Sequence, residues 1–422
     1  MPNGDNWQGD VLRDLRGGAQ QGAQGPGGQA YGASAPGTGL PAQSPGLPAQ
    51  SAQAPDAAPG HGVPQQADHQ HQGQHEQQAG DQGQGDRSQQ TGSQGHVQQA
   101  QAQAPAAYAP GTPHRRTPDS RPVVDQVLAG VGRGPRHGEP FASRAARALR
   151  RIVSSSAARE VAETTRTAEV LQQPVTTGRQ IAVTSIRGGA GKSTVAALLG
   201  TAYAHYRQDP VLLVEADPAL GSLPLRLGAE TLRWTTGDVA GIVEPQMSLL
   251  DITGYLVQLP DNAWLLPGSQ GQIGAMLDTR AYERAMVALR RYFGVTVVDC
   301  ETLPAEVARV ALSAAQARVL TTPATLEGVT STYSVLQWMQ ELPRHVIAGT
   351  VVVLTEQVPH SGLDLDKAAQ KLKSTGAGVH VLPYDRHLAA GGTIRTELLA
   401  RSTRTAATRL AADVFQLSQK RH

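Results

Sequence analysis

The segment Ile186-Arg-Gly-Gly-Ala-Gly-Lys-Ser-Thr194 decides the fold of this chain of 422 residues. It follows an apolar run at residues 180–185 that predicts a buried strand, and it opens a helical pattern that extends to about residue 206. A glycine-rich turn between a strand and a helix is the setting in which backbone N–H groups surround phosphate oxygens. The sequence therefore predicts a phosphate-binding loop.

The residue types inside this loop fit that chemistry. Glycines allow the backbone to curl around phosphate with no Cβ in the way, and the helix N-terminus adds a partial positive charge. We expect Lys192 to reach the β- and γ-phosphates and the Ser193 hydroxyl to ligate Mg²⁺. Lys192 is the first lysine in a chain that otherwise carries its positive charge mostly as arginine. The expected nucleotide-binding residues of the loop are Gly188, Gly189, Ala190, Gly191, Lys192, Ser193 and Thr194.

Short apolar runs and helical patterns alternate after the loop. Such alternation indicates an α/β fold with a mostly parallel sheet covered by helices on both faces. Ligands bind such sheets at the carboxyl ends of the strands. Further strands are expected at residues 211–214, 263–267, 295–298, 318–321, 349–354 and 379–382, and helices at residues 281–292, 305–315 and 363–374.

The loop differs from the strict Walker form, because Ile186 stands where the first glycine would be. It resembles instead the deviant P-loop of the MinD/ParA ATPases, Lys-Gly-Gly-x-Gly-Lys-Ser/Thr, with Arg187 in place of the early signature lysine. In relatives that lysine crosses to the nucleotide held by the other subunit of a face-to-face dimer. The resemblance implies ATP as ligand, an ATP-dependent homodimer and a catalytic contact from Arg187, which keeps the charge. The alternative is that Arg187 merely flanks the loop.

The resemblance continues at two acidic strand ends. Glu215-Ala-Asp217-Pro218 matches the family's Asp-x-Asp-Pro motif, which implies that Asp217 positions or activates the attacking water. Asp299 matches the Walker B aspartate, which implies a role beside Mg²⁺, directly or at one remove. The family's Thr-Pro-Pro-Gly continuation is interrupted here by Cys300-Glu301-Thr302. We interpret Cys300 as a small buried side chain rather than a nucleophile, since no histidine partner is recognisable nearby in sequence.

The residues expected near the base match the family less closely. Thr355 stands where the family often has an asparagine that reads adenine, so the base preference is open. The stretch Leu382-Pro-Tyr-Asp385 resembles the family's Pro-x-Asp loop beside the nucleoside, which implies that Pro383 and Asp385 contribute to the nucleotide site. A plain turn is the alternative.

Composition divides the chain into three parts. Residues 1–120 are rich in Gln, Gly, Pro and Ala and are expected to be disordered, because they offer little to bury against the entropy of ordering. Residues 121–176 predict a basic, partly helical linker, with a helix at residues 143–153. Residues 177–422 predict the P-loop domain. We expect the histidines of the first part to be polar tail residues rather than metal ligands; they are His61, His69, His71 and His75.

Charge and apolar patterning restrict the location. The formal net charge of +2 is too small to imply nucleic acid or an anionic membrane, and the single cysteine excludes an internal disulfide. Neither a signal peptide nor an apolar run of roughly 18–20 residues is recognisable, so a cytoplasmic protein without a transmembrane segment is expected. Residues 405–417 predict a terminal helix packed on the domain rather than a membrane anchor.

The long leader, residues 173–180 and residues 384–390 resemble the MinD-like ATPases of actinobacterial type VII secretion. This favours a switch that dimerises on ATP, hydrolyses it slowly and positions or regulates a partner complex, with the N-terminal region contacting a protein partner. One alternative is an adaptor that binds nucleotide with little hydrolysis. Another is a ParA-type partition ATPase that binds nonspecific DNA. The basic residues considered for DNA are Lys371, Lys373, Arg395, Arg401 and Arg404.

Overall fold

The computed structural model describes residues 117–125, 127–128, 157–219, 221–272, 274–359 and 361–420. Residues 1–116, most of the region expected to be disordered, lie outside these ranges. The helix expected at residues 143–153 lies outside them as well. The division into a linker and a domain at residue 177 stays a prediction.

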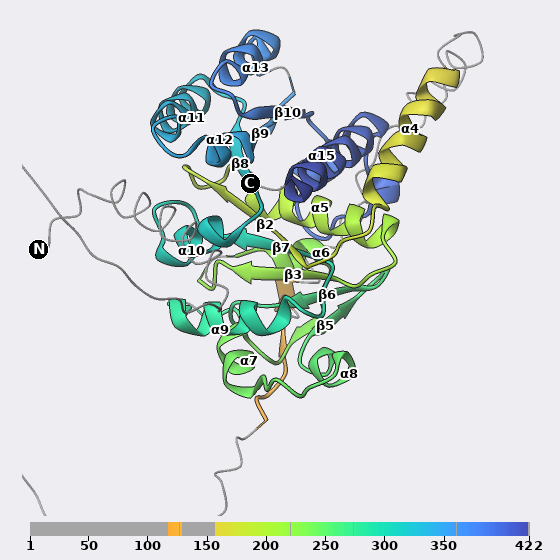
Figure 1. Cartoon of the computed structure of the whole chain (residues 1–422), viewed down its shortest axis with the longest axis vertical. Helices are drawn as coiled ribbons and strands as arrows, with labels where there is room; N and C mark the ends of the chain where they lie inside the picture. The colour runs from red at the N-terminus through yellow and green to blue at the C-terminus, as the bar shows by residue number, and fades with distance from the viewer. Residues whose placement is uncertain are drawn as a thin grey trace, which may run out of the picture. The chain divides into compact units, whose positions relative to one another are not determined.

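The chain is built around an eight-stranded sheet, in which every neighbouring pair is parallel except β5 and β6 (Figure 1). The seven strands expected from sequence are confirmed, and the short antiparallel edge strand β5 was not foreseen. In spatial order the strands are β10 (Gly378–Leu382), β9 (Thr350–Thr355), β8 (Ala317–Pro323), β2 (Arg179–Ser185), β7 (Val295–Cys300), β3 (Val211–Ala216), β6 (Ala263–Leu266) and β5 (Val257–Leu259).

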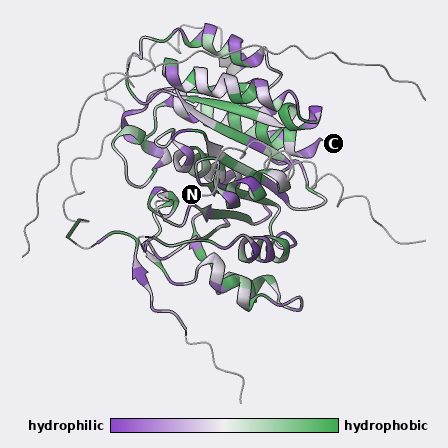
Figure 2. Ribbon diagram, turned by 90° about the vertical axis from the view of Figure 1, so that its left-hand side faces the viewer, coloured by the Kyte–Doolittle hydropathy of each residue, from purple (hydrophilic) through white to green (hydrophobic). Residues whose placement is uncertain are grey.

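Helices cover both faces of this sheet, so its strands are continuously apolar, as the green strands of Figure 2 show. Successive residues of a strand point to opposite faces. In β7, Val297 packs in the core under α5 (Lys192–Tyr206) and α15 (Arg401–Gln419), whereas Val298 packs under helices of the other face. The helices of that other face are α9 (Thr279–Leu289), α10 (Glu306–Ala314), α11 (Leu326–Met339), α12 (Arg344–Ala348) and α13 (Leu365–Lys373).

Short elements complete the described part of the chain. A two-residue antiparallel ladder joins β1 to β4, so residues 121–122 pair with the chain that follows the loop. Capping boxes begin two of the short helices, Thr235 with Asp238 at α7 and Ser248 with Asp251 at α8, and stabilise their first turns. These elements are β1 (Arg121–Pro122), β4 (Thr231–Leu232), α6 (Leu223–Leu227), α7 (Thr236–Ile242), α8 (Leu249–Thr253), α14 (Arg386–Ala389) and the 3₁₀ turn η1 (Thr396–Leu398).

The terminal helix α15 packs on the domain, as expected. Leu410, Val414 and Phe415 are buried in the core shared with α5, and the Tyr203 hydroxyl donates to the Ala411 carbonyl at 2.9 Å. Within the described ranges, no helix is both long and apolar enough to cross a bilayer.

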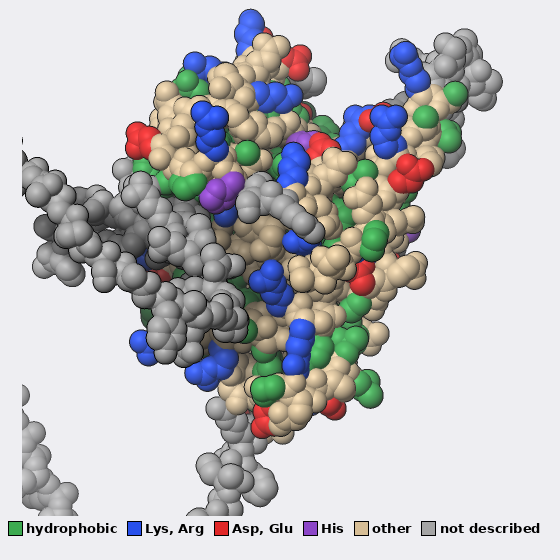
Figure 3. Space-filling model, viewed as in Figure 1, with side chains coloured by type: hydrophobic (Ala, Val, Ile, Leu, Met, Phe, Trp, Pro, Cys, Tyr) green, Lys and Arg blue, Asp and Glu red, His purple; other side chains and the backbone are tan. Residues whose placement is uncertain are grey.

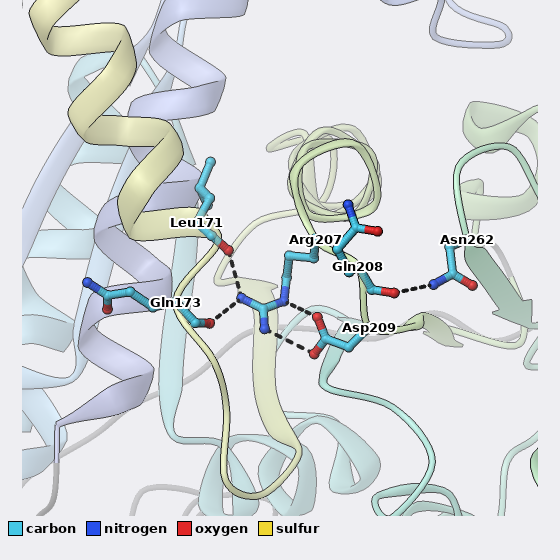
Figure 4. Close-up of polar contacts among 6 residues, drawn as sticks. All are labelled: Leu171, Gln173, Arg207, Gln208, Asp209 and Asn262. Carbon is cyan, nitrogen blue, oxygen red and sulfur yellow. Dashed lines mark hydrogen bonds and ion pairs between the residues drawn. The ribbon is translucent and has the colours of Figure 1, made fainter.

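A buried arginine fixes helix α4 (Ala157–Leu171) to this face (Figure 4). The guanidinium of Arg207 donates to the carbonyl oxygens of Leu171, at 2.7 Å, and Gln173, at 3.0 Å. It also pairs with the Asp209 carboxylate at 2.8 Å and lies over the Phe415 ring, 4.5 Å from its centroid. Because a cation at a helix C-terminus satisfies its last carbonyls, this arginine holds the end of α4 against α5 and α15.

Candidate functional site

The loop between β2 and α5 is an open turn at the carboxyl edge of the sheet. Gly189 and Gly191 have φ angles of 73° and 85°, in the left-handed region that favours glycine. A Cβ built at Gly188 or Gly189 would meet no atom within 4 Å, so this part of the backbone faces open space. At Gly191 a Cβ would lie 3.5 Å from the Thr355 methyl group. The loop thus presents backbone, rather than side chains, to whatever enters the turn.

Helix α5 begins at this turn without a side-chain cap. Gly191 is its N-cap, and no acidic residue lies in the first turn. Backbone N–H groups at such a helix start attract an anion. Lys192 and Ser193 are the first two helical residues and are half-buried. The fold therefore brings the loop glycines, the lysine and the serine together, as the sequence predicted.

Asp299, the second-last residue of strand β7, lies beside this helix start. Its side chain is fully buried, and the Ser193 hydroxyl lies close to the carboxylate but is too poorly placed for a well-formed hydrogen bond. Burial raises the pKa of Asp299 to about 7, against the lowering effects of the Ser193 hydroxyl and the Lys192 ammonium, and the charge of Asp217 raises it further. A buried carboxylate without a well-formed hydrogen bond is costly unless a cation joins it.

The end of β3 supplies two more acidic residues, in different environments. Glu215 is buried and accepts a hydrogen bond from the backbone N–H of Gly268 at 3.2 Å. Burial raises the pKa of Glu215 to about 8, the Gly268 bond lowers it, and the charges of Asp299 and Asp217 add to the rise. Asp217 is half-buried and lies close enough to act electrostatically on the other carboxylates. Glu215 is therefore bonded within the protein, to Gly268, whereas Asp217 is more open to solvent.

A fourth carboxylate follows β7. Burial raises the pKa of Glu301, the charge of Asp217 raises it as well, and the ammonium of Lys192 lowers it. The ammonium of Lys192 also lowers the pKa of Asp299, so one positive charge lies near several carboxylates that repel one another. Such an excess of negative charge favours binding of a cation.

These residues fit Mg²⁺ better than a metal held by protein ligands alone. Among the described residues, no three His, Cys, Asp or Glu side chains are grouped as ligands for one ion. Mg²⁺ is commonly bound through one or two protein oxygens, with waters and substrate phosphates completing its shell. Ser193 and the unsatisfied oxygens of Asp299 are suited to that role.

Arg187 points away from the loop that it begins. Its guanidinium donates to the hydroxyl of Ser331 on α11, from Nη2 at 3.0 Å and from Nε at 3.3 Å. This contact is exposed and lies within one chain. The catalytic contact expected for Arg187 across a dimer therefore stays a prediction.

Strand β9 ends against the loop. The Thr355 hydroxyl lies 3.1 Å from the Ala190 carbonyl and 3.2 Å from the Thr322 carbonyl, and the amide of Gln357 donates to the Gly189 carbonyl. Thr355, at the end of β9, thus supports the loop through the Ala190 carbonyl. Sequence reasoning missed Gln357, an exposed amide two residues beyond the position of the family's adenine-reading asparagine.

The Pro-x-Asp loop follows β10 at the same edge. Both oxygens of Asp385 accept backbone N–H groups, from His387 at 2.8 Å, from Leu388 at 3.2 Å and from Ala400 at 2.8 Å. The carboxylate therefore caps α14 and secures the chain before α15. Nucleoside binding by Pro383 and Asp385 stays a prediction, and on this geometry the loop backbone, rather than the Asp385 carboxylate, is suited to it.

Sequence reasoning also missed Thr302. Its hydroxyl accepts a hydrogen bond from Lys192 Nζ at 3.0 Å. It lies in the insertion that interrupts the family's Thr-Pro-Pro-Gly continuation, and no spacing rule connects residues 110 positions apart. Only the parallel pairing of β2 with β7 brings them together.

A hollow of about 1010 Å³ lies at the opposite ends of the strands. It is lined by segments before β2, β3 and β7, among them Gly178, Pro210 and Gly294. The nearby polar groups are engaged with one another, as in the Arg207–Asp209 pair. We place the functional site at the carboxyl edge instead, because the loop, the helix start and the unsatisfied carboxylate meet there.

This part of the chain is similar in sequence to known proteins. Residues 181–390 match the family model described as the CobQ/CobB/MinD/ParA nucleotide binding domain. The ESX-1 secretion-associated protein EspI of Mycobacterium tuberculosis is 28% identical over 228 residues, which are 52% of this chain and 34% of EspI. The septum site-determining protein MinD of Thermotoga maritima is 34% identical over 124 residues, 29% of this chain and 44% of that protein. The chain thus spans less than half the length of either relative.

Among solved structures, MinD of Pyrococcus horikoshii, complexed with Mg-ADP, aligns with a TM-score of 0.44 at 20% identity, covering 57% of this chain and 98% of that one. The matched residues 181–390 run from β2 through the loop, the acidic strand ends and α14, and so include every part of the site described above. Residues 181–390 of this chain form a nucleotide-binding domain of the CobQ/CobB/MinD/ParA family.

Proposed function

We propose that this chain is a MinD/ParA-like switch ATPase that binds ATP with Mg²⁺, hydrolyses it slowly and dimerises in the ATP state to position or regulate a partner complex. The observation that carries the proposal is the position of Asp299. Its buried carboxylate lies beside Ser193 and Lys192 at the start of α5, where a bound triphosphate would bring Mg²⁺.

Each residue of the site then has a defined task. The backbone of the loop and the start of α5 bind phosphate oxygens, and Lys192 offsets the charge of the β- and γ-phosphates. Asp217, the more open carboxylate, orients the water whose oxygen bonds to the γ-phosphorus as the bond to the β,γ-bridging oxygen breaks. Ser193 and Asp299 would hold Mg²⁺, which offsets the charge of the phosphates.

The edge around the loop is suited to a second copy. Leu326, 68% exposed, follows β8, and Val358, 56% exposed, follows β9 beside the loop. Large apolar side chains next to a polar site are typical of surfaces that become covered. We infer that these residues contact the other subunit when ATP is bound.

Phosphate release and mass in solution test the proposal together. We expect slow phosphate release by the wild-type chain and an ATP-dependent doubling of mass by light scattering. Lys192→Ala should lose both, and Asp217→Ala should keep the ATP-bound dimer but lose hydrolysis. A wild-type chain that stays monomeric with ATP and releases no more phosphate than Lys192→Ala would refute the switch.

An adaptor that binds nucleotide with little hydrolysis is the second candidate. The bond between Arg187 and Ser331 of the same chain favours it, because an arginine held by its own subunit does not reach across a dimer. ATP binding by calorimetry without phosphate release above the Lys192→Ala background would establish this function in place of the switch.

The observations favour a protein partner over DNA. Figure 3 shows Lys and Arg side chains spread over the visible face with neutral groups between them. Lys371, one of the residues considered for DNA, lies 4.5 Å from the centroid of the Tyr333 ring. The match to EspI supports a secretion-associated partner. A contact through the N-terminal region and a cytoplasmic location stay part of the proposal. Salt-sensitive, ATP-dependent binding to nonspecific DNA would favour the partition function instead.

A further inference from the structure

Thr302 is fixed from both sides to the strand that leads into the phosphate loop. The carbonyl of the preceding residue, Glu301, accepts a hydrogen bond from the Thr184 hydroxyl at 2.8 Å. The N–H of the following residue, Leu303, donates to the carbonyl of Ser185 at 2.9 Å. Two consecutive residues of β2 thus hold the backbone around Thr302, which places its hydroxyl in front of Lys192.

The hydroxyl lies in a hydrogen-bond chain with one possible direction. Lys192 Nζ has no lone pair and must donate to Thr302 Oγ1, at 3.0 Å. The Ser185 hydroxyl donates its single proton to the Arg187 carbonyl, at 2.8 Å. In the contact between the two hydroxyls, at 3.5 Å, Thr302 is therefore the donor. The chain runs from Lys192 through Thr302 and Ser185 to the Arg187 carbonyl, where the phosphate loop begins.

A neutral partner matters at this place. Asp299 and Glu301 lie near enough to interact with Lys192 electrostatically, and Asp217 lies near enough to act on both of these carboxylates. A carboxylate that captured the ammonium would neutralise it and compete with phosphate. A hydroxyl takes one of the three N–H groups and leaves the charge and the other two N–H groups for a ligand.

We propose that Thr302 is a positioning residue that holds the Lys192 ammonium ready for the terminal phosphates and couples it to the start of the loop. This inference rests on the proposed function and names a residue outside the motifs that the family resemblance supplied. Because Lys192 reaches the γ-phosphate, ATP affinity should depend on Thr302 more strongly than ADP affinity does.

Calorimetric titration with Mg-ATP and Mg-ADP tests this. Thr302→Val keeps the shape of the side chain and removes the hydroxyl, and Thr302→Ser keeps the hydroxyl. We expect Thr302→Val to weaken ATP about tenfold, the size of one hydrogen bond to a charged group, and ADP about threefold or less. Thr302→Ser should retain the wild-type ratio of ATP to ADP affinity. The melting temperatures of all three proteins should agree. Equal melting temperatures would show that a changed ratio of ATP to ADP affinity comes from the site and not from a general loss of structure.

Two results would overturn the inference: an ATP to ADP ratio in Thr302→Val equal to that of the wild type, or an equal loss in Thr302→Ser. If Thr302→Val melted early, Thr302→Ala, which leaves space instead of a misplaced methyl group, gives the same comparison. A wild-type chain that bound no ATP would refute the proposed function itself and this inference with it. ATP binding that is indifferent to Thr302 would refute the inference alone.

Discussion

Glu215 and Asp299 are Cα partners in the parallel register of β3 and β7. Both side chains are buried, the charge of Asp299 raises the pKa of Glu215, and the charge of Asp217 raises the pKa of both. Two strand ends therefore bring unfavourable negative charge to the same edge. This electrostatic repulsion occurs at the place where a bound cation and triphosphate would reduce it.

Stability without ligand should fall as the pH rises. The pKa of Glu215 is about 8 in the folded state against 4.5 for the free group, so the folded state binds the proton more tightly. The stabilisation is fully present below about pH 4.5 and is lost as the pH rises through about 8. Thermal melts in EDTA should show this decline, and Glu215→Gln should flatten it by an amount on the order of a few kcal/mol.

The exposed Asp251→Asn substitution is the matched control, because the hydrogen bonds from Ser248 lower the pKa of Asp251, so this carboxyl does not change the slope above pH 5. A wild-type melting curve that did not change between pH 5 and pH 9, or a Glu215→Gln protein with the wild-type slope, would contradict the assignment.

Asp299→Asn should uncouple nucleotide binding from magnesium. The amide cannot supply the charge that would hold Mg²⁺, so we expect a loss of about 10- to 100-fold in ATP affinity with Mg²⁺ and little change in EDTA. The asparagine should also raise the melting temperature of the free protein, since a buried charge is removed. Equal losses with and without Mg²⁺ would place Asp299 outside the metal site.

The sequence predicted what depends on local pattern. Seven strands, the loop, and the order strand–loop–helix follow from apolar runs and glycines, and α15 followed from its spacing. Contacts between distant segments were out of reach, because no periodicity connects Thr302 with Lys192 or Arg187 with Ser331. The edge strand β5, of three residues, is too short to show an apolar pattern.

Ser331→Ala should free Arg187. The bond that it removes is exposed and therefore at the lower end of about 0.5–1.5 kcal/mol, so we expect a rise of about two- to threefold in ATP-dependent dimerisation or phosphate release if Arg187 acts across the dimer. Arg187→Ala should abolish this gain. Ser334→Ala, on the same helix and bonded only within it, is the control. No change in Ser331→Ala, together with normal activity in Arg187→Ala, would leave Arg187 as a residue that flanks the loop.

Arg207→Met should release helix α4 from the domain. The substitution keeps the apolar stem but leaves the carbonyls of Leu171 and Gln173 without their donor and Asp209 without its partner. Because Asp209 is only partly buried, we expect a loss of about 2–4 kcal/mol in the free energy of unfolding. Limited proteolysis followed by mass spectrometry should show faster cleavage between α4 and β2. Arg290→Met is the matched control, since Arg290 also contacts this connection, at the Gly178 carbonyl, but from an exposed position. Equal cleavage rates in the two variants would show that α4 is held by its packing on α15 rather than by the arginine.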